Sequence, residues 1–570
     1  MARRAIRAQD LRPMAVTVLL LAAWGLLGFR LFQVQAVRAE EFAGLALDQR
    51  LRRVTLAADR GTIFDREGRE LAISVDAVTI YANPQETPDP DTTAALVSPL
   101  LPDAPVGRAT IAGRLREARK AGSSFVYIAR KLEPRQAERL LEADIPGIHH
   151  LLERKRVYPA GSLAAQVLGV VGSDNEGLEG LELRYDDTLS GSPGELLVER
   201  DPQGHIIPQG EYEAVPPNPG SDLVLTIDRE IQFAAERTLA QAVRRTGAAG
   251  GSIVAMDPET GGLLAMASVP SFDPNQLEEA GPGALRNRAA TDSYEPGSTQ
   301  KLMTVAAALD AGAVEPETRL RVADHIQVWD KTYRDAAPHP TEVMTVADIV
   351  AHSSNVGTIL IERRLGDEGF YRYLTAFGLG RPTGVDFPGE LPGALAEVDE
   401  WCGPCGASTS IGYGVSVTAL QMAAAFSAVA NDGVWVEPHL VGEVVDGRGS
   451  RRPPELERRR VVSERTALIS RLLLEGVVER GTGELARVEG YRVGGKTGTT
   501  VKYLPQYERY GEDVVASFIG MAPTEDPQVV VAVMIDSPVR DTTGGRAAAP
   551  AFAEVMLFAL HQAGVPPDAP

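Results

Sequence analysis

Three short groups of residues have side chains and spacings that suit acyl transfer. Ser298 lies three positions before Lys301, Ser353 lies two positions before Asn355, and residues 496–498 read Lys-Thr-Gly. A serine hydroxyl is a weak nucleophile unless a neighbouring group accepts its proton. The first pair therefore predicts a nucleophile, Ser298, with Lys301 as its activating base.

The spacing of this first pair supports the assignment. Residues three positions apart on a helix lie on one face, so Lys301 Nζ can reach Ser298 Oγ. Pro296 and Gly297 precede the serine and place it in the first turn, where free N–H groups favour negative charge. For Lys301 to act as a base, its pKa must fall by about three units, at a cost of about 4 kcal/mol. Burial and a second cation, Lys496, could supply that shift.

The second group offers a proton relay. It lies in a break between two helix-prone stretches. Ser353 could pass a proton between Lys301 and the leaving amine of a substrate. Asn355 could donate a hydrogen bond to a substrate amide and hold Lys301 in place.

The third group lies on a strand-like run and offers contacts to a substrate. Lys496 and Thr497 provide a cation and a hydroxyl for a carboxylate, and Gly498 lets an extended substrate lie against the strand backbone. The backbone N–H groups of Ser298 and Thr499 are the expected oxyanion donors. Each group alone is a weak signal, but the three in this order predict one catalytic site.

The elements that would position these groups resemble a sheet with helices packed against it. Strand-like apolar runs occur in two pairs, and Asp228 can cap a helix with buried positions at helical spacing. Helices flank or interrupt these hairpins, so an antiparallel sheet covered by helices is the expected layering. The expected strands are 252–256, 263–267, 514–521 and 529–535, and a final helix is expected at 551–562.

The preceding half of the chain has a different pattern. Residues 60–68 predict a strand entry followed by an Asp/Gly turn, and residues 84–104, rich in Pro and Asp, predict an exposed loop. Residues 106–157 are helix-prone and carry basic patches. The Pro-rich segment 216–220 is a plausible domain boundary.

The N-terminus indicates export. Residues 14–29 form an uninterrupted apolar run after four arginines, and the run approaches the about 20 residues of a spanning helix if its flank continues it. The basic flank should stay in the cytoplasm. A cleaved signal peptide is the alternative reading. Either reading exports the rest of the chain, and we favour an anchor.

Bulk composition narrows the classes of protein. A chain of 570 residues exceeds what one core usually serves. The net charge of −20 disfavours nucleic acid as a partner. Two cysteines exclude a disulfide-based scaffold.

The two cysteines form the sequence Trp-Cys-Gly-Pro-Cys at 401–405, which has the thioredoxin spelling. Thioredoxin-type exchange requires a strand that delivers the first cysteine to a helix N-terminus, and the surrounding sequence does not predict one. We therefore favour a short-loop disulfide in an oxidising compartment, or two inert thiols. A metal site would need further ligands, and none is clustered nearby.

Taken together, these motifs resemble the class B penicillin-binding proteins, closest to the cell-division type. The same three groups occur in penicillin-binding proteins and class A β-lactamases. Gln300 departs from the hydrophobic residue expected there. Further segments carry the resemblance along nearly the whole chain: 286–292, 294–299, 411–418, 60–68 and 177–182.

The resemblance implies a multidomain α/β protein. It would comprise a cytoplasmic tail (1–12), a transmembrane anchor (13–35), an elongated α+β pedestal of the dimerisation type (50–215) and a penicillin-binding transpeptidase domain (221–565). It would be a single-pass protein of the plasma (inner) membrane, with its N-terminus cytoplasmic and its catalytic domain outside.

The resemblance also implies an activity and partners. Ser298 would be acylated by stem peptides ending in D-Ala-D-Ala, and the acyl group would pass to an amine of a neighbouring peptidoglycan strand during septal synthesis. β-Lactams would acylate the same serine covalently. A membrane-embedded glycan polymerase and other division proteins are the implied partners, and no cofactor or metal is implied.

Two alternatives remain open. The first is a hydrolase with the same motifs, a D,D-carboxypeptidase or β-lactamase, because only the acceptor differs. The second is a non-catalytic penicillin-binding division scaffold or sensor. The anchor and long pedestal favour transpeptidation, and the intact motifs disfavour a site that merely binds.

Overall fold

The chain folds into two compact units. The computed structural model describes residues 8–42, 51–101, 106–199, 212–504, 507 and 509–569. Residues 1–59 and 191–218 form one unit, and residues 60–190 and 219–570 form the other.

The first unit contains one long apolar helix and a small sheet. Within it, the stretch Pro13–Val37 has 25 residues, a mean hydropathy of 2.0 and no buried part. By length and composition this stretch is sufficient to cross a membrane. The elements of this unit are α1 (Ala8–Phe32), η1 (Gln33–Val37) and an antiparallel sheet of β1 (Leu51–Leu56), β6 (Gly194–Glu199) and β7 (Tyr212–Val215).

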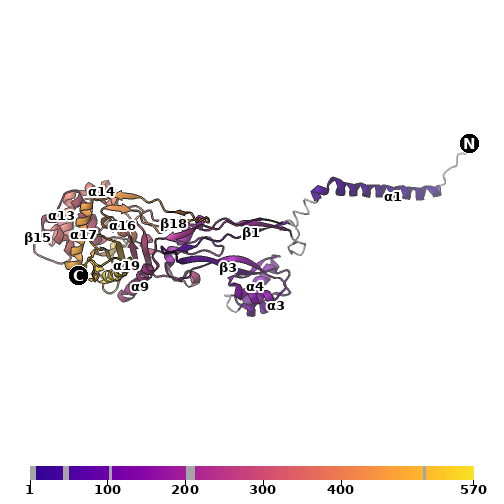
Figure 1. Cartoon of the computed structure of the whole chain (residues 1–570), viewed down its shortest axis with the longest axis horizontal. Coiled ribbons are helices and arrows are strands. Elements are labelled where there is room, and N and C mark those ends of the chain that lie inside the picture. The colour runs from indigo at the N-terminus through magenta and orange to yellow at the C-terminus, as the bar shows by residue number, and fades with distance from the viewer. Residues whose placement is uncertain are drawn as a thin grey trace. The chain divides into compact units, whose positions relative to one another are not determined.

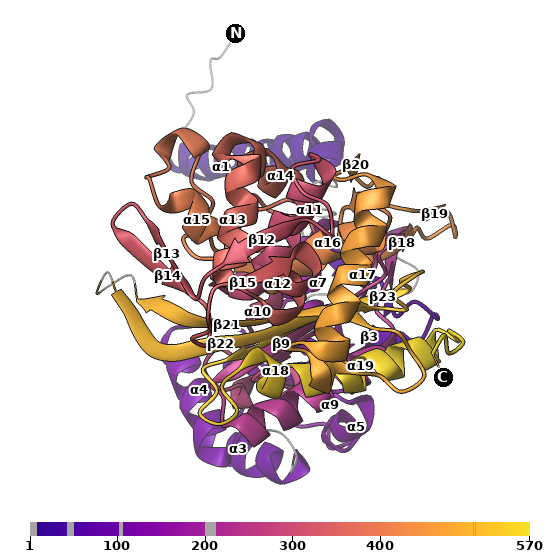
Figure 2. The same ribbon diagram turned by 90° about the vertical axis from the view of Figure 1, so that its left-hand side faces the viewer.

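A five-stranded antiparallel sheet forms the centre of the second unit (Figure 2). The sheet has the order β10-β9-β23-β22-β21, which confirms the two predicted strand pairs and places β21 at an edge. Its strands are β9 (Gly250–Met256), β10 (Leu263–Val269), β21 (Gly494–Leu504), β22 (Arg509–Ala522) and β23 (Val529–Asp536).

Both faces of this sheet are covered by helices (Figure 2). On β9, Ile253 packs into a core with α9 (Arg229–Thr246) and α19 (Ala549–Gln562). The next residue, Val254, packs into the core on the opposite face, with α16 (Ala419–Ala430). Because alternate side chains enter two cores, these strands read as continuous apolar runs in the sequence.

A second sheet joins residues from both halves of the chain (Figure 1). In it, β2 pairs in parallel with β8, so the segment after Arg60 lies beside the strand that follows residue 220. Its order is β19-β18-β8-β2-β3-β4, with β5 also paired to β3. The strands are β2 (Ile63–Phe64), β3 (Glu70–Ala82), β4 (Val126–Leu132), β5 (Ile148–Val157), β8 (Asp222–Leu225), β18 (Val441–Val445) and β19 (Arg451–Arg452).

Two predictions in this half were wrong. The segment 84–104 contains helix α3 (Pro90–Val97), in which Asp89 is the N-cap and Pro90 opens the first turn, so residues typical of a loop here begin a helix. The segment 106–157 contains β4 and β5 as well as α4 (Arg108–Lys120) and α5 (Pro134–Glu142). β5 was missed because its run of charged residues lacks an alternating pattern.

A buried ion cluster ties the segment after Arg60 to the rest of this region. Glu182, fully buried, accepts hydrogen bonds from Arg60 Nε and Arg156 Nε, both at 2.6 Å. Arg60 also contacts Asp186 at 2.6 Å. The two segments that carried the resemblance in this half, 60–68 and 177–182, therefore meet in one charge cluster.

Short elements complete the second unit. Antiparallel pairs are formed by β11 (Ser293–Tyr294) with β16 (Val417–Thr418), β12 (Arg319–Val322) with β15 (Glu342–Thr345), β13 (His325–Val328) with β14 (Lys331–Arg334), and β17 (Val434–Val436) with β20 (Arg458–Arg460). The remaining α-helices of the described residues are α6 (Ala165–Leu168), α7 (Gly180–Arg184), α8 (Asp186–Leu189), α10 (Arg288–Thr291), α11 (Lys301–Asp310), α12 (Val346–His352), α13 (Asn355–Leu365), α14 (Asp367–Ala376), α15 (Cys405–Ser410), α17 (Glu464–Arg480) and α18 (Gly544–Ala547).

Candidate active site

Ser298 lies on a tight turn that opens a buried helix. The 3₁₀ turn η4 (Gly297–Gln300) leads directly into α11 (Lys301–Asp310). Gly297 has a φ of +54°, and a Cβ there would lie 2.2 Å from Thr500 Oγ1. Glycine is therefore required at this position. The predicted location of Ser298 at the start of a helix is confirmed.

A second glycine packs against the back of this turn. Gly297 N donates a hydrogen bond to Gly412 O at 3.1 Å. A Cβ on Gly412 would lie 2.2 Å from Gly297 O. Ile411 and Tyr413, on either side of Gly412, line the same cavity as Ser298. The segment 411–418, noted for its resemblance, thus packs against the turn that carries Ser298.

Lys301 is held by the second motif. Its Nζ donates hydrogen bonds to Ser353 O at 2.6 Å and Asn355 Oδ1 at 2.7 Å, and it lies 3.2 Å from Ser353 Oγ. Among the residues that the structure describes, Ser298 Oγ makes no hydrogen bond with Lys301 or any other group. The predicted contact between Lys301 and Asn355 is present, whereas the contact between Lys301 and Ser298 is not a hydrogen bond here.

Lys496 approaches the same serine from the sheet. Its Nζ donates to Ser353 Oγ at 2.9 Å and to Thr497 O at 3.3 Å. Lys301 and Lys496 have relative exposures of 1% and 0%. Ser353 Oγ therefore lies between two buried amines.

Burial disfavours the charged forms of both amines, and the neighbouring Lys496 adds to this effect for Lys301. Burial, followed by the neighbouring Lys496, holds the pKa of Lys301 well below its usual range, while Asp335 acts in the opposite direction. Burial lowers the pKa of Lys496 to about 7. An uncharged amine can accept a proton, so the environment supplies the shift that a lysine base requires.

The turn that carries Ser353 is held by a residue that the sequence did not single out. Ser353 has a φ of +58° between α12 (Val346–His352) and α13 (Asn355–Leu365), a conformation that costs energy for a non-glycine residue. Asp335 accepts hydrogen bonds from Ser354 Oγ at 2.7 Å, from Asn355 N at 2.5 Å and from Val356 N at 3.0 Å.

Asp335 follows directly after β14, far from the motif in sequence. No local spacing in the sequence links Asp335 to residues 353–355, because its hydrogen bonds to this motif bridge residues that are about 20 positions apart. Arg334, its neighbour, accepts a hydrogen bond from Asn355 Nδ2 at 2.7 Å through its carbonyl oxygen. The backbone at 334–335 therefore fixes both the amide side chain and the first turn of α13.

The third motif lies on the edge strand β21. A Cβ on Gly498 would lie 2.4 Å from Ser517 Oγ and 3.0 Å from Pro296 O, so this strand packs closely against the Ser298 turn. Thr497 Oγ1 is 2.7 Å from Thr482 Oγ1, and Thr499 Oγ1 accepts a hydrogen bond from Gly544 N at 2.9 Å.

The three motifs meet at one cavity of about 570 Å³. The two lysines lie behind its wall, joined to it through Ser353. A hydroxyl, a lysine amine that burial keeps from holding charge, a second lysine whose pKa burial lowers to about 7 and an edge strand suit nucleophilic attack on an extended peptide. The predicted site residues that line this cavity are Ser298, Ser353, Asn355, Thr497 and Thr499.

Comparison with known families agrees with this geometry. Residues 251–557 match the penicillin binding protein transpeptidase domain. Residues 55–225 match the penicillin-binding protein dimerisation domain. Both halves of the second sheet thus belong to segments with known relatives.

Individual relatives match over nearly the whole chain. The chain is 34% identical to penicillin-binding protein PbpB of Mycolicibacterium smegmatis, over 96% of this chain and 89% of the relative. It is 35% identical to the probable peptidoglycan D,D-transpeptidase PbpC of Pseudomonas aeruginosa, over 97% of this chain and 95% of the relative.

A solved structure extends the agreement to the fold. The crystal structure of penicillin binding protein 3 from Mycobacterium tuberculosis, complexed with aztreonam, superposes with a TM-score of 0.72 at 31% identity, covering 91% of this chain and 99% of that one. A transpeptidase domain preceded by a dimerisation domain, in the same order and at this similarity, identifies the chain as a member of the class B penicillin-binding proteins.

Proposed function

We propose that this protein is a serine D,D-transpeptidase that cross-links peptidoglycan stem peptides, with Ser298 as nucleophile. The single observation that carries the proposal is the arrangement around Ser353, whose hydroxyl lies within hydrogen-bond distance of both Lys301 Nζ and Lys496 Nζ. This arrangement joins the base, the relay and the substrate-binding strand in one network. The related proteins named as D,D-transpeptidases support the same reaction.

In the proposed acylation, Ser298 Oγ attacks the carbonyl carbon of the penultimate D-alanine, and its proton passes to uncharged Lys301. The backbone N–H groups of Ser298 and Thr499 stabilise the oxyanion. Ser353 relays a proton to the nitrogen of the terminal D-alanine, which leaves as the amine. An ester to Ser298 remains.

In the second step, an amine from a neighbouring strand attacks this ester and regenerates the serine. Throughout, Thr497 binds the carboxylate of the donor peptide at the cavity wall, and the charge of Lys496 attracts that carboxylate from behind the wall. The donor backbone extends along β21, which Gly498 allows to pack closely against the Ser298 turn. Asn355 orients the donor amide and Lys301. β-Lactams would acylate Ser298 in the same way, and the related penicillin binding protein 3 has been solved complexed with aztreonam.

The placement of the chain in the cell is also a proposal. We assign residues 1–12 to the cytoplasm, 13–35 to a single membrane span, 50–215 to the pedestal and 221–565 to the transpeptidase domain outside the membrane. The basic flank before the apolar helix supports this orientation. We further propose a septal role, with a membrane-embedded glycan polymerase and other division proteins as partners.

Covalent labelling with a fluorescent penicillin tests the nucleophile. The wild-type chain should be labelled, the label should map to the peptide containing Ser298, and Ser298→Ala should lose it. Ser293→Ala, which changes an exposed serine nearby, is the matched control and should label normally. Persistent label in Ser298→Ala would remove that residue from its role.

A second measurement separates transfer from hydrolysis. A stem-peptide donor is supplied with and without an amine acceptor, and the products are identified by mass spectrometry. A transpeptidase yields a cross-linked product in competition with the acid, whereas a carboxypeptidase or β-lactamase yields only the hydrolysed product.

A further inference from the structure

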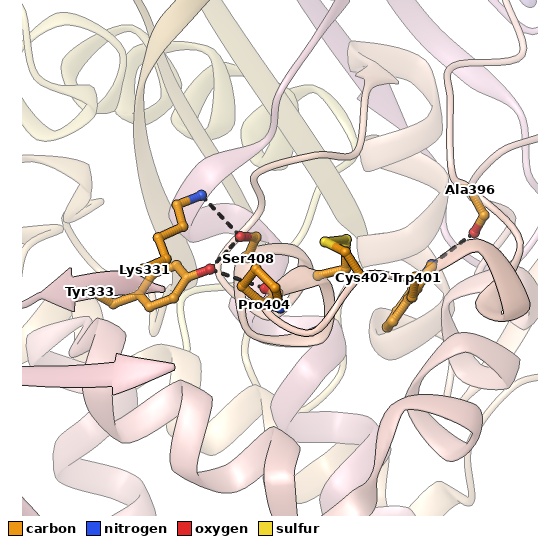
Figure 3. Close-up of a disulfide and its surroundings, with 8 residues drawn as sticks. Lys331, Tyr333, Ala396, Trp401, Cys402, Pro404 and Ser408 are labelled. Atoms are coloured by element: carbon orange, nitrogen blue, oxygen red, sulfur yellow. Dashed lines mark hydrogen bonds between the residues drawn. A yellow bond between two sulfur atoms is a disulfide. The ribbon is translucent and has the colours of Figure 1, made fainter. Parts of the chain in front are cut away.

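The two cysteines form a disulfide at the start of a helix that leads to Ile411, which lines the active-site cavity. Cys402 and Cys405 are bridged, which agrees with the disulfide alternative drawn from the sequence. Cys402 is exposed and Cys405 is half-buried at the start of α15 (Cys405–Ser410). Figure 3 shows this loop and the side chains that hold it.

We propose that the Cys402–Cys405 disulfide is a thiol–disulfide exchange site for a dithiol outside the membrane, and that its oxidised form holds the Ser298 site in its acylating arrangement. The exchange chemistry is independent of the transpeptidase assignment. The coupling to acylation rests on the proposed function of Ser298.

The disulfide loop is open to a reaction partner. Gly403 and Ala407 line a cleft of about 910 Å³ together with Trp329, whose side chain is 77% exposed. A Cβ on Gly403 would lie 2.3 Å from the Trp329 ring, so the indole covers the loop at its glycine while Cys402 stays accessible. An external thiolate can therefore approach Cys402 Sγ.

An acidic pair, Glu362 and Asp367, lines the same cleft as Gly403 and Ala407. A Cβ on Gly406 would lie 2.1 Å from Asp367 Oδ1 and 3.0 Å from Glu362 Oε1. Burial, together with the Asp367 side chain, raises the pKa of Glu362 to about 8. Glu362 lines the cleft beside the loop, so its protonated carboxyl is available there as a proton donor when a thiolate is released from the disulfide.

The exchange balances without a further reactant. One thiolate of the dithiol attacks Cys402 Sγ, the bond between Cys402 and Cys405 breaks, and Cys405 Sγ leaves as a thiolate that takes up a proton. The second thiol of the dithiol then attacks the mixed disulfide and releases Cys402 as a thiol. The dithiol is oxidised to a disulfide by two electrons, and the protein disulfide is reduced by two.

One route connects the loop to the nucleophile along the chain. The helix α15 begins at Cys405 and leads into Gly412, whose carbonyl oxygen accepts the hydrogen bond from Gly297 N at 3.1 Å. Ser410 O, at the end of α15, accepts a hydrogen bond from Thr304 Oγ1 at 2.8 Å, on the helix that carries Lys301. Loosening the start of α15 therefore loosens two supports of the site.

A second route passes through β14 to the Ser353 turn (Figure 3). Tyr333 OH donates to Pro404 O at 3.0 Å and lies 2.5 Å from Ser408 Oγ, and Lys331 Nζ donates to Ser408 Oγ at 3.2 Å. Tyr333 and Lys331 belong to the strand that ends at Arg334, whose carbonyl oxygen holds Asn355. Reduction of the disulfide frees Pro404 from its closed loop and weakens this anchorage.

Acylation of the oxidised and reduced full-length chain tests the proposal. The chain is treated with dithiothreitol or with reduced thioredoxin, free thiols are alkylated and counted by intact mass, and the reductant is removed before labelling with fluorescent penicillin. The chain contains only two cysteines, so no other disulfide can respond. We expect no alkylated thiol before reduction, two after it, and acylation slowed about 5-fold or more, as for a typical coupling between sites.

Two variants separate the coupling from a failure to fold. The double variant Cys402→Ser, Cys405→Ser should be acylated at the rate of the reduced chain, and dithiothreitol should not change that rate. Tyr333→Phe keeps the disulfide but removes the hydroxyl bonded to Pro404, and should slow acylation in the same direction. Thermal unfolding of each variant shows whether it folds.

Each outcome decides one statement. Equal acylation of oxidised and reduced chains, with two thiols counted, overturns the coupling. Resistance of the folded chain to both reductants at neutral pH overturns the exchange site. Absence of label in the oxidised wild type contradicts the proposed function instead, because the redox comparison then has no acylation to measure.

Discussion

Ser353 Oγ accepts a hydrogen bond from Lys496 Nζ at 2.9 Å. Lys301 Nζ lies 3.2 Å from the same oxygen. Two buried amines that share one hydroxyl repel each other when both are charged, so they titrate as a pair. The first consequence concerns pH.

The acylation rate should depend on pH with a maximum. Lys301 must be uncharged to accept the proton, and burial holds its pKa well below the usual range, so the rate should rise with pH and reach its plateau well below the usual lysine pKa of about 10.4. In the proposed mechanism Lys496 must be charged to attract the substrate carboxylate, and burial lowers its pKa to about 7, so the second-order rate should fall above that value. The measurement is the second-order rate of penicillin acylation against pH.

Lys496→Arg provides the control for this profile. A guanidinium stays protonated over the whole pH range. The decrease of the acylation rate at alkaline pH should therefore disappear, while the rise of the rate at acid pH should stay in place or move to lower pH. An unchanged alkaline fall would show that another group causes it.

Lys301→Arg should remove the base while keeping positive charge. Because a guanidinium does not deprotonate, acylation should fall by about 10²- to 10⁴-fold, measured as the rate of label uptake. Circular dichroism should show a folded chain. A loss of less than tenfold would mean that the proton of Ser298 goes elsewhere.

Asp335→Asn should slow acylation through the Ser353 turn. The change disturbs the acceptor for Ser354 Oγ, and a displacement of the site by about 1 Å can cost about 100-fold. It also removes the charge that raises the pKa of Lys301, so the acid side of the pH profile should move to lower pH.

Asp330→Asn is the matched control for Asp335→Asn, since it removes one exposed charge from the nearby β13–β14 turn. It should leave the pH profile unchanged. A purely structural role for Asp335 would lower the rate without moving the profile.

Gly498→Ala should reduce both stability and acylation. The new Cβ would meet Ser517 Oγ at 2.4 Å and Pro296 O at 3.0 Å, and overpacking of this kind costs about 1–3 kcal/mol. Gly442→Ala is the control, because its Cβ would come no closer than 3.5 Å to any atom. Thermal unfolding and label uptake should separate the two variants.

Glu182→Gln should destabilise the second unit strongly. It leaves the buried Arg60 and Arg156 without their shared carboxylate, and breaking such a pair costs about 3–5 kcal/mol. Glu443→Gln removes the partner of the exposed Arg451 and should cost less than about 1 kcal/mol. The measurement is the midpoint of urea unfolding. Similar midpoints for the two variants would show that burial of the Glu182 cluster does not increase its contribution to stability.

The sequence predicted those parts of the site that depend on local spacing. The turn at Ser298, the break at Ser353 and the strand at Lys496 follow from motifs and periodicity. The roles of Asp335 and Gly412 could not be predicted in this way, because they arise from contacts between segments that are distant in sequence. In the preceding half, β5 pairs through its backbone with β3. Its charged side chains do not form the alternating pattern that would have predicted a strand.

The contact between Gly297 and Gly412 limits how this protein can acquire resistance to antibiotics. A Cβ on Gly412 would lie 2.2 Å from Gly297 O, and a Cβ on Gly297 would lie 2.2 Å from Thr500 Oγ1. Neither glycine can therefore be replaced without moving the backbone around Ser298. Selection for drug tolerance should therefore fall on cavity-lining side chains such as Tyr413 and Leu485. Their replacement alters the fit of an inhibitor while the backbone around Ser298 is preserved.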